Sequence, residues 1–477
     1  MEITDNAAII LLGKILNVKQ IKCIGLSVFY PPKNVYTTVK IKHDINEIFI
    51  LFCQNKLNRL NEICEMKKVF STSLTALIIL FSISIFQNVA HAEPLIHKQI
   101  EKLEQHKKLL REKLNADKNQ EPISFKIRRP KKDAAHDLVP KIRERLTLKG
   151  YLGYYAHSGN VNDHTIMDAL KKVQKTNFLD QTGEFDTKTC EALNESITED
   201  LKLIEINIDR LEKIKDDAKN TKKMIFVNVA QYHLFALKQG NVELEMDVII
   251  GKKSRRTIIG DDLLHTVVIN PTWTIPKQIL LEDKLEIFTE DPDYLKRKNY
   301  VIFDEDRNRV SPDKIDWNDV EENPLTYRFR QNPGENNVLG GFKFLLDNKQ
   351  AIYMHDTNAK KLFKKTVRTF SSGCIRLKDP ESMAEWLLKD YGDIECPINT
   401  DGSSKYPPTC VKEMIGDYQE QKRQKFLKLT EKVPVILGYI TYWIGDDGLA
   451  YKSNDPYSKD DALLQLSLSK LIDGEKL

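Results

Sequence analysis

The sequence has almost no excess charge of one sign. Its 73 basic and 69 acidic residues leave a net charge of +4 over 477 residues. The basic residues are dispersed and no DNA- or RNA-binding signature accompanies them, which argues against a nucleic-acid partner. Hydrophobic residues at 41% and charged residues at 30% are typical of a folded chain rather than a disordered one. The length predicts two or three folded units.

Cysteine is also scarce, with 7 residues in the whole chain. Four of them follow residue 92, namely Cys190, Cys374, Cys396 and Cys410. None of these four has C-x-x-C spacing, which argues against a structural zinc site.

One apolar run has the features of a secretory signal. Met66-Lys67-Lys68 precedes the apolar segment 69–86, and Ala90-His91-Ala92 follows it. A basic, an apolar and a small-x-small segment in this order predict a signal peptide at 66–92 that is cleaved after Ala92. An uncleaved membrane anchor is the alternative, because the run is near the lower length limit of a spanning helix.

This signal makes residues 1–65 a doubtful upstream extension, because such signals work at an N-terminus. We expect translation to begin at Met66 instead. The mature chain would occupy the periplasm or cell envelope and would meet the membrane only transiently, through the signal segment. In that oxidising compartment Cys396 and Cys410 either form a disulfide or remain two free thiols.

The rest of the chain divides where its hydrophobic period changes. Near-helical intervals predict an amphipathic helix at 96–114, followed by a solvated basic connector that completes a segment 93–134. Residues 135–198 show three further helical patterns, the last of them N-capped by Asp186. The capping-box pattern Ser196-Ile197-Thr198-Glu199 then opens a connecting helix at 199–222.

A β-sheet domain begins at residue 223, where the period becomes two and β-branched and aromatic residues are frequent. It extends to residue 400, and a C-terminal helix and strands at 401–477 complete it. Residues 276–340 within it are charged, helix-prone and too long for a plain connection. We expect an inserted helical subdomain that lies over the sheet as a lid.

A histidine and a cysteine in this domain carry the chemistry. His355 ends an expected strand, and Cys374 follows the tight turn Ser371-Ser372-Gly373. A free thiol with a pKa of ~8.5 is mostly protonated at neutral pH, and a neighbouring imidazole can take its proton. The N–H groups of Gly373 and Cys374 are candidate oxyanion donors, each contributing about 3 kcal/mol in other acyl-transfer enzymes. Either residue alone is most often structural, whereas the pair with its flanks is much more specific.

The strings around this pair resemble the YkuD-type L,D-transpeptidases, whose signature is H-x(n)-S-x-G-C-x-R. The flanks are similar to the larger periplasmic YcbB-type subgroup, and the resemblance covers roughly residues 135–460. Many family members have a second histidine where this chain has Ser372, as that subgroup does. The matching strings are Asn270-Pro271-Thr272-Trp273-x-x-Pro276, Arg330-Gln331-x-Pro333-Gly334-x-x-Asn337-x-Leu339-Gly340, Lys343-Phe344, His355-Asp356-Thr357 and Ser371-Ser372-Gly373-Cys374-Ile375-Arg376.

The resemblance implies a multidomain α+β protein. It would combine a peptidoglycan-binding-like helical module at 135–198, a mainly β YkuD-type catalytic domain at 223–400 and a helical capping insertion at 276–340. In the module, Val173 and Asp186 stand where binding modules of this kind more often have an aromatic residue and a glycine. A helical spacer without a ligand is the alternative.

The resemblance also implies an activity. Cys374 would attack the third residue of a donor tetrapeptide stem, with His355 as general base and acid. The side-chain amine of an acceptor diaminopimelate would then capture the thioester as a 3→3 cross-link. This acyl transfer needs no metal and no organic cofactor, and carbapenems would acylate Cys374. The alternatives are an L,D-carboxypeptidase or endopeptidase that uses the same pair, and a non-catalytic wall-binding protein.

The remaining candidates would bind substrate. Arg376 either holds a stem carboxylate or pairs with a local acid. Tyr353 shares a sheet face with His355 by the period of two, and Trp273 either lines the groove or packs in a core. The full set of substrate-binding candidates is Arg376, Tyr353, Ser371, Ser372 and Trp273.

Overall fold

The computed structural model describes residues 94–124, 130–153, 159–391, 410–461 and 463–464, and one strand pair, β1 Ser27–Val28 with β2 Thr37–Thr38. The chain divides into two units at residues 91 and 92. The predicted signal and Cys396 lie outside the described residues, as does the side chain of Cys410, so export and the disulfide stay predictions. Within the described ranges, no helix combines the length and apolar character needed to cross a membrane.

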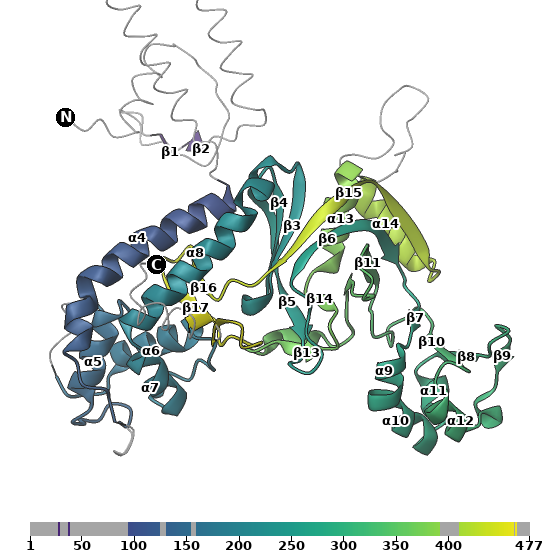
Figure 1. Ribbon diagram of the computed structural model, residues 1–477, viewed down its shortest axis with the longest axis horizontal. Coiled ribbons are helices and arrows are strands. Elements are labelled where there is room, and N and C mark those ends of the chain that lie inside the picture. The colour runs from purple at the N-terminus through teal and green to yellow at the C-terminus, as the bar shows by residue number, and fades with distance from the viewer. Residues whose placement is uncertain are drawn as a thin grey trace, which may run out of the picture. The chain divides into compact units, whose positions relative to one another are not determined.

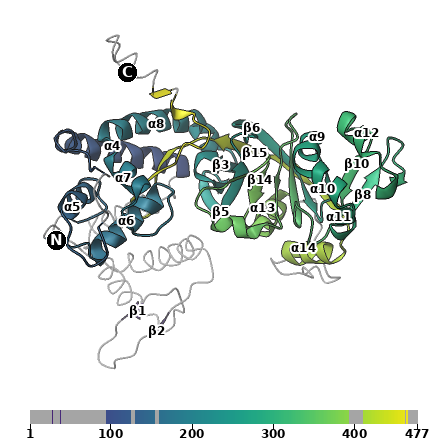
Figure 2. The same cartoon turned by 90° about the horizontal axis from the view of Figure 1, so that it is seen from below.

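Two long helices pack side by side (Figure 1, Figure 2): α4 Leu95–Lys118 and α8 Ile197–Asn220. α4 confirms the predicted amphipathic helix and is longer than predicted. α8 begins at the expected capping box, in which Glu199 N donates to the Ser196 hydroxyl and Ser196 N donates to the Glu199 carboxylate. The apolar stripes of both helices share one core with aromatic residues of the sheet beside them.

Three short helices form a unit with its own hydrophobic core: α5 Val139–Leu148, α6 His164–Thr176 and α7 Thr187–Asn194. They confirm the three helical patterns of the sequence. The Asp186 carboxylate caps α7 by accepting a hydrogen bond from Thr189 N at 2.8 Å, as predicted. Glycan binding by this unit stays a prediction.

The predicted basic connector, which begins at residue 115 within the last turn of α4, is exposed over most of its described length but contains two buried residues. Asp117 is buried, pairs with Arg145 at 2.6 Å and accepts a hydrogen bond from Ile197 N at 2.9 Å. Ile123 is buried in the core of the three-helix unit, while residues 125–129 lie outside the described part of the chain. The exposure of the other residues agrees with the prediction, whereas composition alone does not show that one carboxylate has a buried cationic partner.

Replacing Asp117 with alanine should destabilise the protein by about 3 kcal/mol or more, because Arg145 would remain buried without a partner. The free energy of unfolding in denaturant measures this loss. Glu121→Ala is the matched control, because its pair with Lys141 is exposed and should contribute less than about 0.5 kcal/mol. If both substitutions lower the free energy of unfolding equally, the buried Asp117–Arg145 pair contributes no more to stability than the exposed pair does.

Nine strands form the central sheet in the order β13-β5-β14-β12-β11-β6-β15-β3-β4. β4 also pairs with β5, so the sheet closes on itself like a barrel. β15 comes from the C-terminal segment and lies between β6 and β3, so this segment is an integral part of the sheet. The strands are β3 Lys223–Asn228, β4 His233–Lys238, β5 Asn241–Gly251, β6 Gly260–Ile269, β11 Phe342–Leu346, β12 Met354–His355, β13 Thr369–Ser371, β14 Ile375–Leu377 and β15 Lys425–Gly438.

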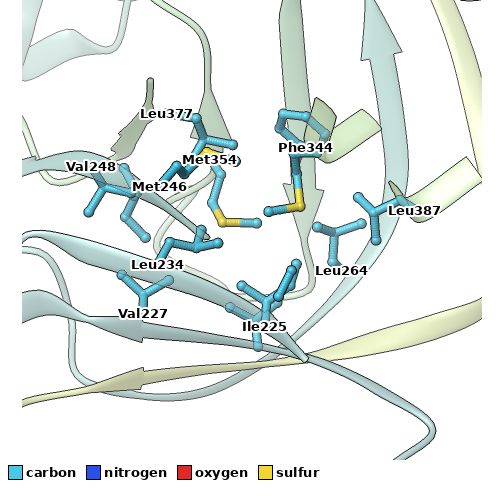
Figure 3. Packing of buried hydrophobic residues seen from close by; sticks show 14 of the residues in the cluster. Ile225, Val227, Leu234, Met246, Val248, Leu264, Phe344, Met354, Leu377 and Leu387 are labelled. Carbon is cyan, nitrogen blue, oxygen red and sulfur yellow. The ribbon is translucent and has the colours of Figure 1, made fainter. Parts of the chain in front are cut away.

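The inner face of the sheet forms the main hydrophobic core (Figure 3), in which Leu234, Met246 and Phe344 converge from different strands. Helices α13 Pro380–Tyr391 and α14 Cys410–Glu420 contribute to the same core. Burying one such side chain stabilises the fold by about 1.5–3 kcal/mol. A hairpin, β16 Tyr442–Ile444 with β17 Ala450–Lys452, follows the sheet and packs against α4 and α8.

The insertion between β6 and β11 is a small α+β subdomain rather than the helical one predicted. Its four-stranded sheet has the order β7-β10-β8-β9, and its elements gather in one group in both views (Figure 1, Figure 2). Phe288 and Phe329 stack at its centre. The sequence did not indicate these short strands, because the segment is rich in charged, helix-prone residues. The elements are β7 Trp273–Thr274, α9 Lys277–Ile279, a π-helix Leu280–Lys284, α10 Leu285–Glu290, α11 Asp293–Arg297, β8 Tyr300–Phe303, β9 Arg309–Val310, α12 Trp317–Glu322 and β10 Arg328–Gln331.

Candidate active site

The two strings singled out in the sequence meet on neighbouring strands. β12 and β14 pair in parallel, with His355 directly opposite Arg376. The adjacent pair, Met354 and Ile375, is fully buried in the core. Because side chains alternate between the faces of a strand, the opposite face carries a four-residue array: Tyr353, His355, Cys374 and Arg376.

A cleft of about 580 Å³ lies over this array. Its floor is the outer face of the sheet and includes Lys343 on β11, which is opposite His355 in the β11–β12 pairing. Pro276 and Ile279, at the start of the insertion, contribute to its wall. Every candidate residue from the sequence lines this cleft except Gly373.

The Cys374 thiol is half-buried and close to Tyr353. Burial raises the pKa of this thiol, and hydrogen bonds from the backbone and phenol of Tyr353 and the charges of Lys343 and Arg376 oppose that shift. The thiol is therefore protonated at neutral pH and needs a base before it can attack a carbonyl.

The His355 ring is also buried, and its pKa is shifted in the opposite direction from that of the thiol. Burial, with the charges of Arg376 and Lys343, lowers the pKa of His355 to about 3, while a hydrogen bond with the Asp356 backbone partly opposes this shift. The ring is thus a neutral imidazole near pH 7, the form that accepts a proton.

The expected direct hydrogen bond between ring and thiol is absent. Nδ1 of His355 is buried, and no partner for it occurs in the part of the chain that the structure describes. Both side chains nevertheless line the same cleft, with His355 on β12 and Cys374 immediately before the adjacent strand β14. Catalytic hydrogen bonds are often long in unliganded enzymes and tighten only with substrate.

The turn before Cys374 is held by its own hydrogen bonds. The Ser371 hydroxyl donates to Cys374 O at 2.5 Å and accepts from Gly373 N at 3.2 Å. Gly373 has a φ of 113°, a left-handed conformation that favours glycine. Its N–H is therefore already used within the turn, and the prediction that it donates to the oxyanion is not supported. The N–H of Cys374 has no partner among the described residues and remains the candidate donor.

Residues 222–409 match the family model of the L,D-transpeptidase catalytic domain, YkuD. This segment is a YkuD domain. It contains the whole array and most of the strands that position it.

The chain is also similar to other proteins. A Haemophilus influenzae protein provisionally named as an L,D-transpeptidase is 35% identical over 255 residues, which cover 54% of this chain and 47% of that protein. The chain thus matches about half the length of this curated relative. An Enterococcus faecium L,D-transpeptidase structure is 16% identical, with coverage of 46% and 50% and a TM-score of 0.20. The E. faecium catalytic domain acylated by ertapenem is 13% identical, with coverage of 45% and 96% and a TM-score of 0.20.

The other predicted residues of the YkuD domain differ in what they contact. Ser371 is buried and its hydroxyl is used within the turn, so its position is structural. Ser372 accepts a hydrogen bond from Arg255 at 2.8 Å. Trp273 packs in the core of the insertion and also lines the cleft, so both of its alternatives hold. Tyr353 makes an edge-on contact with the His355 ring at 5.5 Å, and burial raises the pKa of its phenol.

Arg376 and Lys343 are two cations in this cleft without an acidic partner. No ion pair joins either side chain to a carboxylate among the described residues, and Nε of Arg376 is buried without a hydrogen-bond partner. Among these described residues Arg376 therefore has no acid to pair with, which was one of its two predicted alternatives. Nor do the described residues include a cluster of three or more histidine, cysteine or acidic side chains that could hold a metal ion.

Lys343 is the site residue that the sequence analysis missed. Its Nζ lies 3.8 Å from the centroid of the Tyr353 ring, and burial lowers the pKa of its ammonium group. The lysine interrupts the apolar residues Phe342 and Phe344 with the period of a strand, which places it on the outer face. That alternation was the available signal. The partner strands that bring Lys343 beside Tyr353 and His355 could not be deduced from it.

Replacing Lys343 with methionine should raise the pKa of the Cys374 thiol, because a nearby positive charge that favours the thiolate is removed. We expect alkylation of Cys374 by iodoacetamide at pH 7.5 to slow roughly tenfold, the equivalent of one pKa unit. Mass spectrometry across a pH series gives the midpoint pH of the alkylation rate, and this midpoint should move to higher pH. Lys343→Arg should restore it, and the exposed Lys361→Met serves as the control. An unchanged midpoint in Lys343→Met would mean that this charge does not act on the thiol.

Proposed function

We propose that this protein is a peptidoglycan L,D-transpeptidase that forms 3→3 cross-links between stem peptides. The observation that carries the proposal is one cleft in a YkuD domain that contains a thiol, a neutral imidazole and two cations with no acidic partner among the described residues. Stem peptides carry free carboxylates, and Arg376 and Lys343 are suited to bind them. The imidazole is suited to activate the thiol.

The first half of the reaction forms an acyl-enzyme. His355 takes the thiol proton as the Cys374 sulfur bonds to the carbonyl carbon of the third stem residue. The N–H of Cys374 stabilises the developing oxyanion. The C–N bond to the terminal D-amino acid then breaks, and the His355 proton moves to the departing amine. A thioester remains on the protein.

The second half transfers the acyl group. The side-chain amine of an acceptor diaminopimelate attacks the thioester carbonyl, and His355 removes its proton. The C–S bond breaks and the proton returns to the Cys374 sulfur. The product is an amide between two stems. Water in place of the amine would give a shortened stem, so the choice of acceptor decides between a transferase and an L,D-carboxypeptidase.

We propose further roles for the parts around the YkuD domain. The insertion would cap the cleft, which is supported by Pro276 and Ile279 among its lining residues. The three-helix unit α5–α7 would bind peptidoglycan strands, in line with the resemblance of its sequence. The protein would act in the periplasm or cell envelope, where this substrate lies and where the signal-like segment 66–92 would direct it.

Incubation of the purified protein with a disaccharide tetrapeptide tests the proposal. Mass spectrometry should detect a cross-linked dimer together with the released terminal amino acid. Tripeptide without dimer would identify a hydrolase instead. If neither product forms under conditions in which the protein is folded, the enzymatic proposal fails.

A further inference from the structure

Arg255 joins the insertion to the turn that carries the nucleophile. It lies in the loop between β5 and β6, and its side chain is buried. Nη1 donates to Asp283 at 2.5 Å and to Ser372 Oγ at 2.8 Å, while Nη2 donates to Asp283 at 3.0 Å and also to Glu282. One guanidinium therefore contacts two carboxylates of the insertion and the residue two positions before Cys374.

The insertion presents these carboxylates from a fixed position. Glu282 and Asp283 lie in the π-helix Leu280–Lys284, a rare element that occurs frequently at functional sites. Leu280 and Leu285, at either side of the carboxylates, are buried in the core of the insertion. A movement of Glu282 or Asp283 away from Arg255 would therefore take the insertion core with it.

The backbone of the Arg255 loop is equally constrained. A Cβ atom on Gly251 would lie 2.2 Å from Arg255 O, so only glycine fits where the loop leaves β5. The Thr257 hydroxyl accepts from Gly251 N at 2.9 Å and donates to Gly373 O at 2.8 Å. Tyr457 adds a hydrogen bond to Gly251 O at 2.8 Å. The loop is thus attached to the nucleophile turn through the Thr257 side chain as well as through Arg255.

We propose that Arg255 is a positioning residue that clamps the insertion against the nucleophile turn and thereby favours the amine acceptor over water. This inference rests on the proposed function. The cleft wall formed by Pro276 and Ile279 immediately precedes the clamped π-helix, so loss of the clamp would free that wall. A loosened wall admits water to the thioester and holds the acceptor less well. Lysine could not substitute, because only the planar guanidinium can donate to several partners in this fixed geometry.

The test compares Arg255→Met and Arg255→Lys with the wild-type protein in the tetrapeptide assay. We expect cross-link formation to fall roughly tenfold to a hundredfold, release of the terminal amino acid to fall much less, and the ratio of hydrolysis to cross-linking to rise in both variants. Arg297→Met is the control, because it breaks an exposed ion pair with Asp291 inside the insertion and should leave the ratio unchanged.

A double-mutant cycle separates the clamp from a general loss of structure. Asp283→Asn should raise the same ratio, and combining it with Arg255→Met should add little to the effect of Arg255→Met alone, because both changes break the Arg255–Asp283 contact. An unchanged ratio in Arg255→Met would overturn the proposal. So would an equal fall of cross-linking and of amino-acid release, because that pattern indicates only less folded enzyme.

Failure of the proposed function would be recognised separately. If the wild-type protein releases no terminal amino acid, hydrogen exchange of residues 276–340 still tests the clamp. Faster exchange in this segment of Arg255→Met than in wild type would support it. Equal exchange would overturn it.

Discussion

Replacing Cys374 with alanine should abolish both cross-linking and release of the terminal amino acid. The expected loss is roughly a thousandfold or more, because the alanine variant lacks the sulfur atom on which the acyl intermediate would form. The products are measured by mass spectrometry after incubation with the tetrapeptide. Cys190→Ala is the matched control, because Cys190 is a buried thiol of the three-helix unit that donates to Ile123 O at 3.3 Å.

The same variant pair also tests acylation by a carbapenem. The intact mass of the wild-type protein should increase by one adduct, which peptide mapping should locate on Cys374. Cys190→Ala should retain the adduct and Cys374→Ala should lose it. Turnover that survives in Cys374→Ala, or an adduct on another cysteine, would remove Cys374 from the mechanism.

Replacing His355 with asparagine should slow acylation of Cys374 by about 10²–10⁴-fold, the usual contribution of a general base. Because burial lowers the pKa of His355 to about 3, the imidazole stays neutral throughout the range from pH 5 to 8. The acylation rate of the wild-type protein should therefore show no acidic limb near pH 6.5 and should rise toward the raised pKa of the thiol. Stopped-flow or mass-spectrometric acylation rates across this range measure both effects.

The same residue affects stability with a defined sign. The unfolded chain protonates His355 below about pH 6.5, whereas the folded chain does so only near pH 3. The contribution of the neutral His355 ring to the free energy of unfolding is thus fully present above pH 6.5. This contribution is lost as the pH falls toward 3, by up to about 1.4 kcal/mol per pH unit. His355→Asn should remove this component, while the exposed His164→Asn should not.

Acylation that persists at the wild-type rate in His355→Asn would exclude this residue as the base.

Local sequence patterns correctly predicted the helix starts that depend only on interactions between neighbouring residues. The capping box at Ser196 and the cap at Asp186 each need only a side chain and a nearby backbone N–H, and both occur as expected. The predictions failed where an element depends on contacts with residues far away in the sequence. The insertion contains a four-stranded sheet because short strands such as Tyr300–Phe303 find partners, which a charged and helix-prone composition does not indicate.

The candidate site divides in the same way. The motif around Cys374 and His355 identified both residues, and the period of two correctly placed Tyr353 beside His355. Neither motif nor period indicates that Ser371 uses the N–H of Gly373, since this contact depends on how the turn closes.

The sequence by itself determined the type of chemistry, because a nucleophile, a base and a glycine turn are recorded in two short strings around His355 and Cys374. Only the tertiary structure decided the electrostatic setting of that chemistry. The register of β11 against β12 brings Lys343 to the cleft, and the π-helix of the insertion brings Asp283 to Arg255. Strand register and subdomain docking depend on packing between distant segments, which a linear pattern does not encode residue by residue.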